Sequence, residues 1–135
     1  MKKRINILML IAFVLYLATI ALLCFLHGED LPNVTGTWFG LPADKVAHAL
    51  MFLPFIPLSF FAFSTDRNSF IKDMFLLIGL AVVGIGSAYL TELIQDHLGY
   101  RRYELKDFIS DCMGLAAGFG LISLWLIIKH SRKRK

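Results

Sequence analysis

Four long apolar segments constrain this chain more than any other feature of its sequence. Hydrophobic residues make up 57% of the 135 residues, above the roughly 45–50% of soluble domains. Each segment has about the 17–25 residues that a helix needs to cross a bilayer. Backbone polar groups inside a membrane need partners within the protein, and runs of this length supply them as helices rather than as barrel strands. The sequence therefore predicts an all-α fold, an integral membrane bundle of four transmembrane helices at about residues 5–26, 44–63, 72–96 and 107–129.

These helices leave no room for a second domain, so we predict a single transmembrane domain over residues 1–135. The first segment follows a basic start, as a signal peptide does, but its apolar run exceeds the roughly 7–15 residues of a signal core. No pair of small residues with cleavage spacing precedes His27. We therefore expect a retained anchor helix.

The basic residues indicate an orientation. Ten of the 14 lysines and arginines lie near the two ends of the chain or around the connection between the second and third predicted helices. Short basic segments resist translocation, so we expect this side to be cytoplasmic, with both termini on it. The net charge of +4 is concentrated at the termini rather than among stacking aromatics. The expected partner is therefore the lipid bilayer, and not nucleic acid.

Polar residues open the second predicted helix. Asp44 is placed to cap its start, and His48 lies one turn further on over the same face. A histidine at this depth costs free energy unless it has a partner, so we interpret it as functional. Lys45 fits two interpretations, a charge that extends to the lipid headgroups and a ligand contact. Pro54 and Pro57 predict a kink in this helix.

The third helix carries small and then polar residues on one face. Small residues allow a neighbouring helix to approach closely, and the stripe leads to a carboxylate near the membrane boundary. That carboxylate is interpreted as functional, with a structural ion pair to Arg101 or Lys45 as the alternative. The stripe consists of Ala81, Gly84, Ala88, Glu92 and Gln95.

The fourth helix places Asp107, Asp111, Gly114 and Gly118 on one face. The two glycines form a Gly-x-x-x-Gly pattern, which is typical of tight helix packing. Asp107 is placed to cap the helix, but Asp111 lies a full turn deeper. Two carboxylates this close disfavour joint ionisation unless a cation such as Arg101 lies nearby.

Topology brings these groups to one boundary, because the second helix begins, the third ends and the fourth begins on the side opposite the termini. We expect one outer-face site there, and no comparable buried polar group at the cytoplasmic ends. The predicted substrate-binding residues are Asp44, Lys45, His48, Glu92, Gln95, Arg101, Asp107 and Asp111.

The spacing of these residues resembles that of the VanZ-like family of membrane proteins. One departure is Asp111, where the family commonly has Asn, which makes this site more acidic. The resemblance implies a bacterial cytoplasmic (inner) membrane protein linked to glycopeptide resistance, notably to teicoplanin, but no settled biochemical activity. The matching elements are Asp44-Lys45-x-x-His48, Glu92-x-x-Gln95, Arg101, Asp107 and the pair Gly114 and Gly118.

Three functions fit these residues, and whether the chain is an enzyme stays open. The first is binding of an outer-leaflet lipid headgroup or a lipophilic glycopeptide, with Arg101 and Lys45 facing anionic groups. The second is catalysis on a lipid-linked envelope substrate, with His48, Glu92 and Asp107 as candidate catalytic residues. The third is a structural polar network, or pairing of the bundle with itself through its Gly-x-x-x-Gly face.

We expect no cofactor and no metal; a divalent ion held by His48 and the carboxylates is a less favoured variant. Cys24 and Cys112 lack metal-ligand spacing and are interpreted as packing residues. A transport path through one copy of four short helices would be narrow. Transport would therefore require a homodimer.

Overall fold

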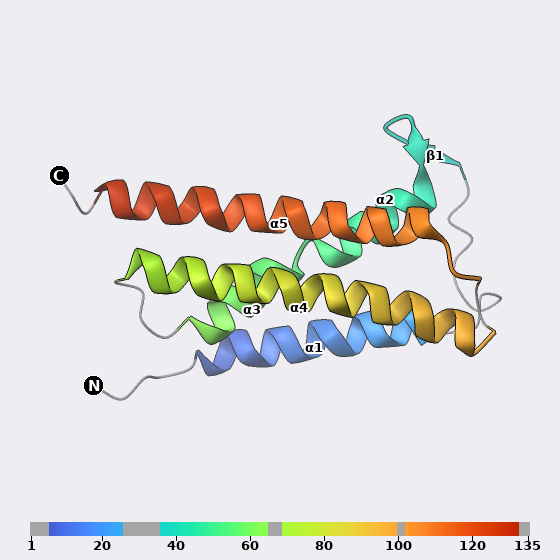
Figure 1. Cartoon of the computed structure of the whole chain (residues 1–135), viewed down its shortest axis with the longest axis horizontal. Helices are drawn as coiled ribbons and strands as arrows, with labels where there is room; N and C mark the ends of the chain where they lie inside the picture. Colours follow the sequence, from blue (N-terminus) through green and yellow to red (C-terminus); the bar gives the residue numbers. More distant parts are fainter. Residues whose placement is uncertain (1–5, 26–35, 65–68, 100–101, 133–135) are drawn as a thin grey trace.

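The computed structural model describes residues 6–25, 36–64, 69–99 and 102–132. Within these residues, four segments are long and apolar enough to cross a membrane, and the second of them, Ala43–Phe63, is made of two helices. The predicted all-α bundle of four spans is confirmed, and the chain is a multi-pass membrane protein (Figure 1). The elements are α1 (Ile7–Phe25), β1 (Thr37–Trp38), β2 (Leu41–Pro42), α2 (Ala43–Phe52), α3 (Phe55–Phe63), α4 (Phe70–His97) and α5 (Leu105–Arg132).

The helices lie along the long axis of the molecule (Figure 1). α5 packs most extensively against α2 and α4, while α1 packs mainly against α3. α1 begins and α5 ends at the same end of the bundle, as an even number of crossings requires. At the other end, here called the site end, α2 begins, α4 ends and α5 begins.

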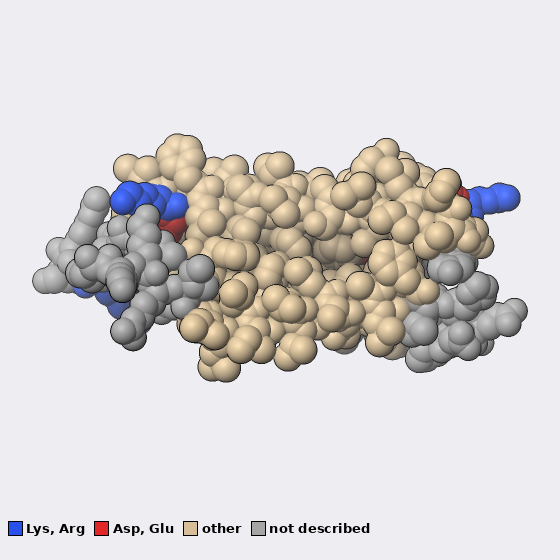
Figure 2. Space-filling model, turned by 90° about the horizontal axis from the view of Figure 1, so that it is seen from below, with Lys and Arg blue, Asp and Glu red and all other residues tan. Residues whose placement is uncertain are grey.

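The surface of the bundle is apolar over most of its length. Leu8 is 72% exposed, Phe75 73% and Val82 66%. A protein dissolved in water rarely exposes so much contiguous apolar surface, whereas lipid chains would cover it. On the face shown in Figure 2, the charged side chains gather near the two ends of the molecule. This distribution is that of a protein with its middle in hydrocarbon.

Large apolar side chains, many of them aromatic, fill the interior around the second crossing, whose α3 packs against α1 and α5. Phe52, Ile56 and Phe60 are almost completely buried. Phe13 of α1 meets Phe55 of α3 edge to face, with ring centroids 5.5 Å apart and an interplanar angle of 76°. This arrangement brings the positive edge of one ring to the negative face of the other. The packing joins α1 to the second crossing.

The second crossing is broken between α2 and α3, as its prolines predict. Pro54 has no N–H to continue the hydrogen bonds of α2, and it precedes the first residue of α3. Pro57 lies in the first turn of α3, where a proline costs little. Beside the break, the Tyr16 hydroxyl donates a 2.6 Å hydrogen bond to the Met51 carbonyl, which satisfies a backbone acceptor within the membrane span.

Glycines set the contact between α5 and this broken crossing. A Cβ on Gly114 would lie 2.1 Å from the Ala49 carbonyl oxygen, and one on Gly118 would lie 2.6 Å from that of Leu53. Real Cβ atoms do not approach so closely, so the predicted role of both glycines in helix packing is confirmed. The Gly-x-x-x-Gly face is filled by the chain's own α2 and α3, and the prediction that it pairs two copies is therefore wrong. A homodimer through another face stays a prediction.

Two other predicted packing residues lie on the buried stripe of α4. Ala88 is fully buried, and a Cβ on Gly84 would meet side chains, with Leu115 Cδ2 at 2.8 Å and Phe55 Cδ1 at 3.1 Å. The predicted close approach of a neighbouring helix is confirmed at Gly84, where the neighbours are α3 and α5.

A two-stranded hairpin, not predicted from the sequence, leads into α2. Its strands pair Trp38 with Leu41, and the loop residues Phe39 and Gly40 have φ values of 54° and 78°. Positive φ at both loop positions is typical of a type I′ turn, where Asn-Gly is the preferred pair. Phe39 is 98% exposed at the tip. The hairpin thus presents an aromatic side chain at a position that ordinarily excludes one.

The end opposite the site end also contains a buried carboxylate. Asp73 is 3% exposed; it accepts a 3.2 Å hydrogen bond from Ser64 Oγ and lies 3.8 Å from Lys129 Nζ. The prediction that no comparable polar group is buried at this end is therefore wrong. Asp73 belongs to the first turn of α4, and the packing of α3 and α5 around that turn removes it from solvent.

Candidate functional site

Seven ionisable side chains meet at the site end, and we call them the polar cluster. α2 contributes three residues, α4 one and α5 two, while Glu104 immediately precedes α5. Glu92, Asp107 and Asp111 are at most 3% exposed and His48 is 8% exposed. The polar cluster consists of Asp44, Lys45, His48, Glu92, Glu104, Asp107 and Asp111.

Lys45 occupies the more accessible side of the polar cluster. Its Nζ lies 3.0 Å from Asp44 Oδ2 and 2.9 Å from Glu104 Oε1, and it donates a hydrogen bond to Asp107 Oδ1. Asp44 and Glu104 are partly exposed, whereas Asp107 is buried. Lys45 therefore links the surface of the site to its interior, and its ammonium is already held by three carboxylates.

The predicted helix caps differ from those observed. α2 begins at Ala43, so Asp44 lies within its first turn and the N-cap position is Pro42, which has no side-chain cap. The backbone N–H of Ala43 instead donates to the Gly36 carbonyl at 3.0 Å. α5 begins at Leu105, and Asp107 lies in its first turn. The predicted capping roles of both aspartates are wrong, and both carboxylates bind Lys45 instead.

His48 lies between two aspartates of α5. Its Nδ1 is 2.9 Å from Asp111 Oδ1 and its Nε2 is 3.7 Å from Asp107 Oδ2. His48 on α2 and the two aspartates on α5, which were predicted to surround one site, therefore do lie next to one another. A ring nitrogen bonded to a carboxylate fixes the orientation of the imidazole.

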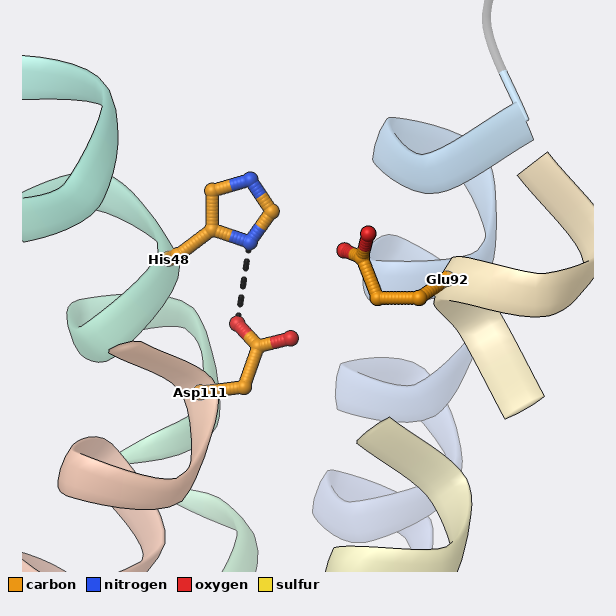
Figure 3. Close-up of side chains that lie close together, drawn as sticks. All are labelled: His48, Glu92 and Asp111. Carbon is orange, nitrogen blue, oxygen red and sulfur yellow. Dashed lines mark hydrogen bonds and ion pairs between the residues drawn. The ribbon is translucent and has the colours of Figure 1, made fainter. Parts of the chain in front are cut away.

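Glu92 approaches this region from α4. Figure 3 shows its carboxylate facing the pair formed by His48 and Asp111. Lys45 pairs with Asp44, Glu104 and Asp107, so the alternative ion pair between Glu92 and Lys45 is not formed among the described residues.

The remaining predicted residues have different positions. Gln95 is buried, and its Nε2 donates a 2.8 Å hydrogen bond to the Cys24 carbonyl near the end of α1. Its amide therefore joins α4 to α1 rather than to the polar cluster. Arg101 lies outside the described residues, and its predicted role stays a prediction.

Glu104 is a member of the polar cluster that was not predicted from the sequence. The residue lies three positions before Asp107, on the segment that leads into α5, and its side chain is 47% exposed. Spacing alone does not distinguish it from an ordinary surface acid. Only the approach of α2 reveals it as a partner of Lys45.

Carboxylates dominate the polar cluster, which contains five acids beside one lysine and one histidine. Mutual repulsion between close carboxylates is strongest where water is scarce, and Glu92, Asp107 and Asp111 are all buried. The arrangement therefore favours cationic groups and hydrogen-bond donors such as amines and hydroxyls. Chemically, the bond between His48 and Asp111 also resembles the pairing that orients a general base.

Comparisons with known proteins add one relative. The chain is similar to a phosphatidate cytidylyltransferase of Staphylococcus saprophyticus, with 31% identity over 105 residues that cover 76% of this chain and 39% of that enzyme. The chain thus spans about two fifths of the length of this relative. No protein-family model and no solved structure matches the chain.

Proposed function

We propose that the chain binds the polar headgroup of an outer-leaflet membrane lipid or of a lipid-linked envelope molecule at the polar cluster. The observation that carries the proposal is a set of buried charged groups at one end of an otherwise apolar bundle. The interfacial layer on each side of a bilayer is about 5–7 Å thick. Asp107 and Asp111 are one helical turn apart, a rise of about 6 Å, so the polar cluster has the depth of a headgroup layer.

The charges of the polar cluster indicate which headgroup atoms each side chain would bind. Its carboxylates suit amines and hydroxyls, which donate hydrogen bonds. Arg101, one residue from the described segment that contains Glu104, is the residue we assign to a phosphate or carboxylate, because its planar fork matches such groups. Lys45 keeps the carboxylates together and contributes less to an anionic ligand.

Two further considerations support a lipid or lipophilic ligand. The relative with 31% identity is named for an enzyme that acts on phosphatidate, which is a lipid. The resemblance to the VanZ-like family adds lipophilic glycopeptides such as teicoplanin to the ligands to be tested. The excess of basic residues near the termini favours the outer face of the membrane for the polar cluster, and the resemblance to the VanZ-like family favours a bacterial cytoplasmic membrane.

Native mass spectrometry of the gently purified chain tests this proposal. The parent protein, Glu92→Gln and Arg101→Ala are compared with a matched control, Asp73→Asn, which alters a buried carboxylate of α4 at the opposite end. We expect the parent and the control to retain a defined lipid that the other two variants lose. Equal retention by all four proteins would place the lipid elsewhere and contradict the proposal.

An enzyme acting on a lipid-linked substrate is the second candidate. It is favoured by the 2.9 Å contact between His48 Nδ1 and Asp111 Oδ1, which orients the imidazole for proton transfer, with Glu92 and Asp107 close by. Catalysis predicts that His48→Ala abolishes product formation while lipid retention persists. Retention without product from any candidate lipid in the parent protein would leave binding as the function.

A further inference from the structure

Three side chains of the polar cluster have the arrangement of metal ligands. His48, Glu92 and Asp111 are all buried, and each offers a ligand atom that lies within 4.8 Å of the other two. They come from α2, α4 and α5, so one position joins three helices from distant parts of the sequence (Figure 3). Buried acids near one another are not by themselves a binding site, and a second observation is needed.

That observation is the second oxygen of Asp111. Oδ1 contacts His48, but Oδ2 has no hydrogen-bond partner among the described residues, although it is inaccessible to solvent. Asp111 as a whole is 1% exposed. Figure 3 shows this oxygen pointing to the side on which Glu92 lies. A buried carboxylate oxygen without a partner is costly, and a cation between the two carboxylates would remove that cost.

We propose that His48, Glu92 and Asp111 bind a divalent transition-metal ion, with Zn²⁺ and Mn²⁺ as the ions to test. One imidazole and two carboxylates suit these ions, whereas Mg²⁺ and Ca²⁺ prefer oxygen ligands alone. Neighbouring ligands of an ion with bonds of about 2.0–2.2 Å lie roughly 3 Å apart. Both oxygens of Asp111 would then bind the ion: Oδ2, which has no partner among the described residues, and Oδ1, which already lies 2.9 Å from His48 Nδ1.

The groups around these three residues fit the proposal. Asp107 Oδ2 lies 3.7 Å from His48 Nε2, on the side of the ring away from Asp111. Metal-binding histidines usually present their second ring nitrogen to such a carboxylate. Lys45 in turn holds Asp107. Glu92 completes the ligand set if its carboxylate oxygen, which lies within 4.8 Å of the other two ligand atoms, closes to the roughly 3 Å expected of neighbouring ligands.

Three protein ligands leave positions open on the ion, as in metal sites that bind substrate. If the chain binds a lipid headgroup, as proposed above, the ion would bind a phosphate or hydroxyl of that headgroup. It would also reconcile an acidic site with an anionic ligand, because the ion's charge offsets the carboxylates. A metal was not expected from the sequence, whereas the geometry of these three residues supports one.

Metal binding by the full-length chain in detergent tests the inference. The protein is purified without a histidine tag, stripped with a chelator, and titrated with Zn²⁺ and with Mn²⁺ by calorimetry, with metal content measured after dialysis. Glu92→Gln and Asp111→Asn are compared with Asp73→Asn as the control. We expect equimolar binding by the parent and control. Since loss of an outer-shell partner alone weakens binding about 10–100-fold, losing a ligand should weaken it at least tenfold.

A parent chain that binds neither ion, or variants that bind as tightly as the parent, would overturn the inference. Circular dichroism checks that each variant is folded. If Asp111→Asn does not fold, the metal affinity of Glu92→Gln and the X-ray absorption spectrum of the Zn²⁺-loaded parent test the inference instead. That spectrum should contain only nitrogen and oxygen ligands at about 2.0–2.2 Å; sulfur ligation would contradict the assignment.

The two proposals fail separately. Lipid that the parent retains after the chelator treatment, with no metal binding, would refute the metal site and leave headgroup binding intact. Equimolar metal binding without any retained lipid would refute headgroup binding and leave the metal site intact.

Discussion

Replacing Gly114 with alanine tests the contact that positions the polar cluster. The new Cβ would lie 2.1 Å from the Ala49 carbonyl oxygen, 2.9 Å from the Ala49 carbonyl carbon and 3.1 Å from the Leu53 nitrogen. All three are backbone atoms, and the oxygen already accepts a 3.0 Å hydrogen bond from that nitrogen. Carbon and oxygen need about 3.3 Å, so α2 and α5 must separate by roughly 1 Å.

The energetic cost follows from two opposing effects. Overpacking typically costs about 1–3 kcal/mol, while alanine gains about 0.8–1 kcal/mol over glycine in a helix. Because all three close contacts are with backbone atoms, the overpacking cost should lie near the upper end of its range, and we expect a net destabilisation on the order of 2 kcal/mol. Because His48 adjoins Ala49 and Asp111 lies one turn from Gly114, the same separation should lengthen the 2.9 Å contact between these two side chains.

Thermal unfolding in detergent, followed by circular dichroism, measures the effect. Gly120→Ala is the matched control, because it lies on the same helix and a Cβ there would meet nothing within 4 Å among the described residues. The control should unfold at or above the parent's temperature, and Gly114→Ala several degrees below it. Equal unfolding temperatures for the two variants would refute the close contact of α2 with α5.

Two further predictions concern the hairpin and the ion pairs. Phe39→Asn should raise the unfolding temperature, since asparagine tolerates the left-handed backbone that costs other residues about 1–2 kcal/mol. Leu41→Asn, on the adjoining strand, is the control and should not raise it. Equal unfolding temperatures for the two variants would exclude strain at the tip of the hairpin. Glu104→Gln should cost about 1 kcal/mol or less, because its side chain is 47% exposed. Asp107→Asn removes the charge of a buried hydrogen-bond partner of Lys45, and hydrogen bonds to charged groups contribute about 1.5–3 kcal/mol, so this variant should lose more stability than Glu104→Gln. Chemical unfolding measures both losses, and a smaller loss for Asp107→Asn would contradict the burial argument.

The spans could be predicted from the sequence because length and hydropathy are local properties. Hydrocarbon accepts only internally bonded backbone, so four long apolar segments allow few alternatives to four helices. The break near Pro54 was predictable for the same reason, since a missing N–H is a property of the residue. The hairpin was not, because Phe39-Gly40 differs from the Asn-Gly pair that usually marks such a turn.

The candidate site could be predicted in part. Helix order alone brings the start of α2, the end of α4 and the start of α5 together, and the periodicity of α4 places Glu92 on its buried face. The actual partners were less predictable. The hairpin and the segment before α5 shift both helix starts, which converts two expected caps into partners of Lys45 and adds Glu104 to the polar cluster.

Sequence spacing thus establishes which residues share a face of each helix and which end of the bundle they occupy. It does not establish how far each helix is rotated about its axis or how closely two helices approach, because those depend on packing between residues distant in the chain. The close approach of the second crossing to Gly114 and Gly118 sets the rotation of α2 and α5 and the distance between them. Only that contact brings His48 to Asp111, turns the second oxygen of Asp111 toward Glu92, and removes the glycine face from contact with another copy.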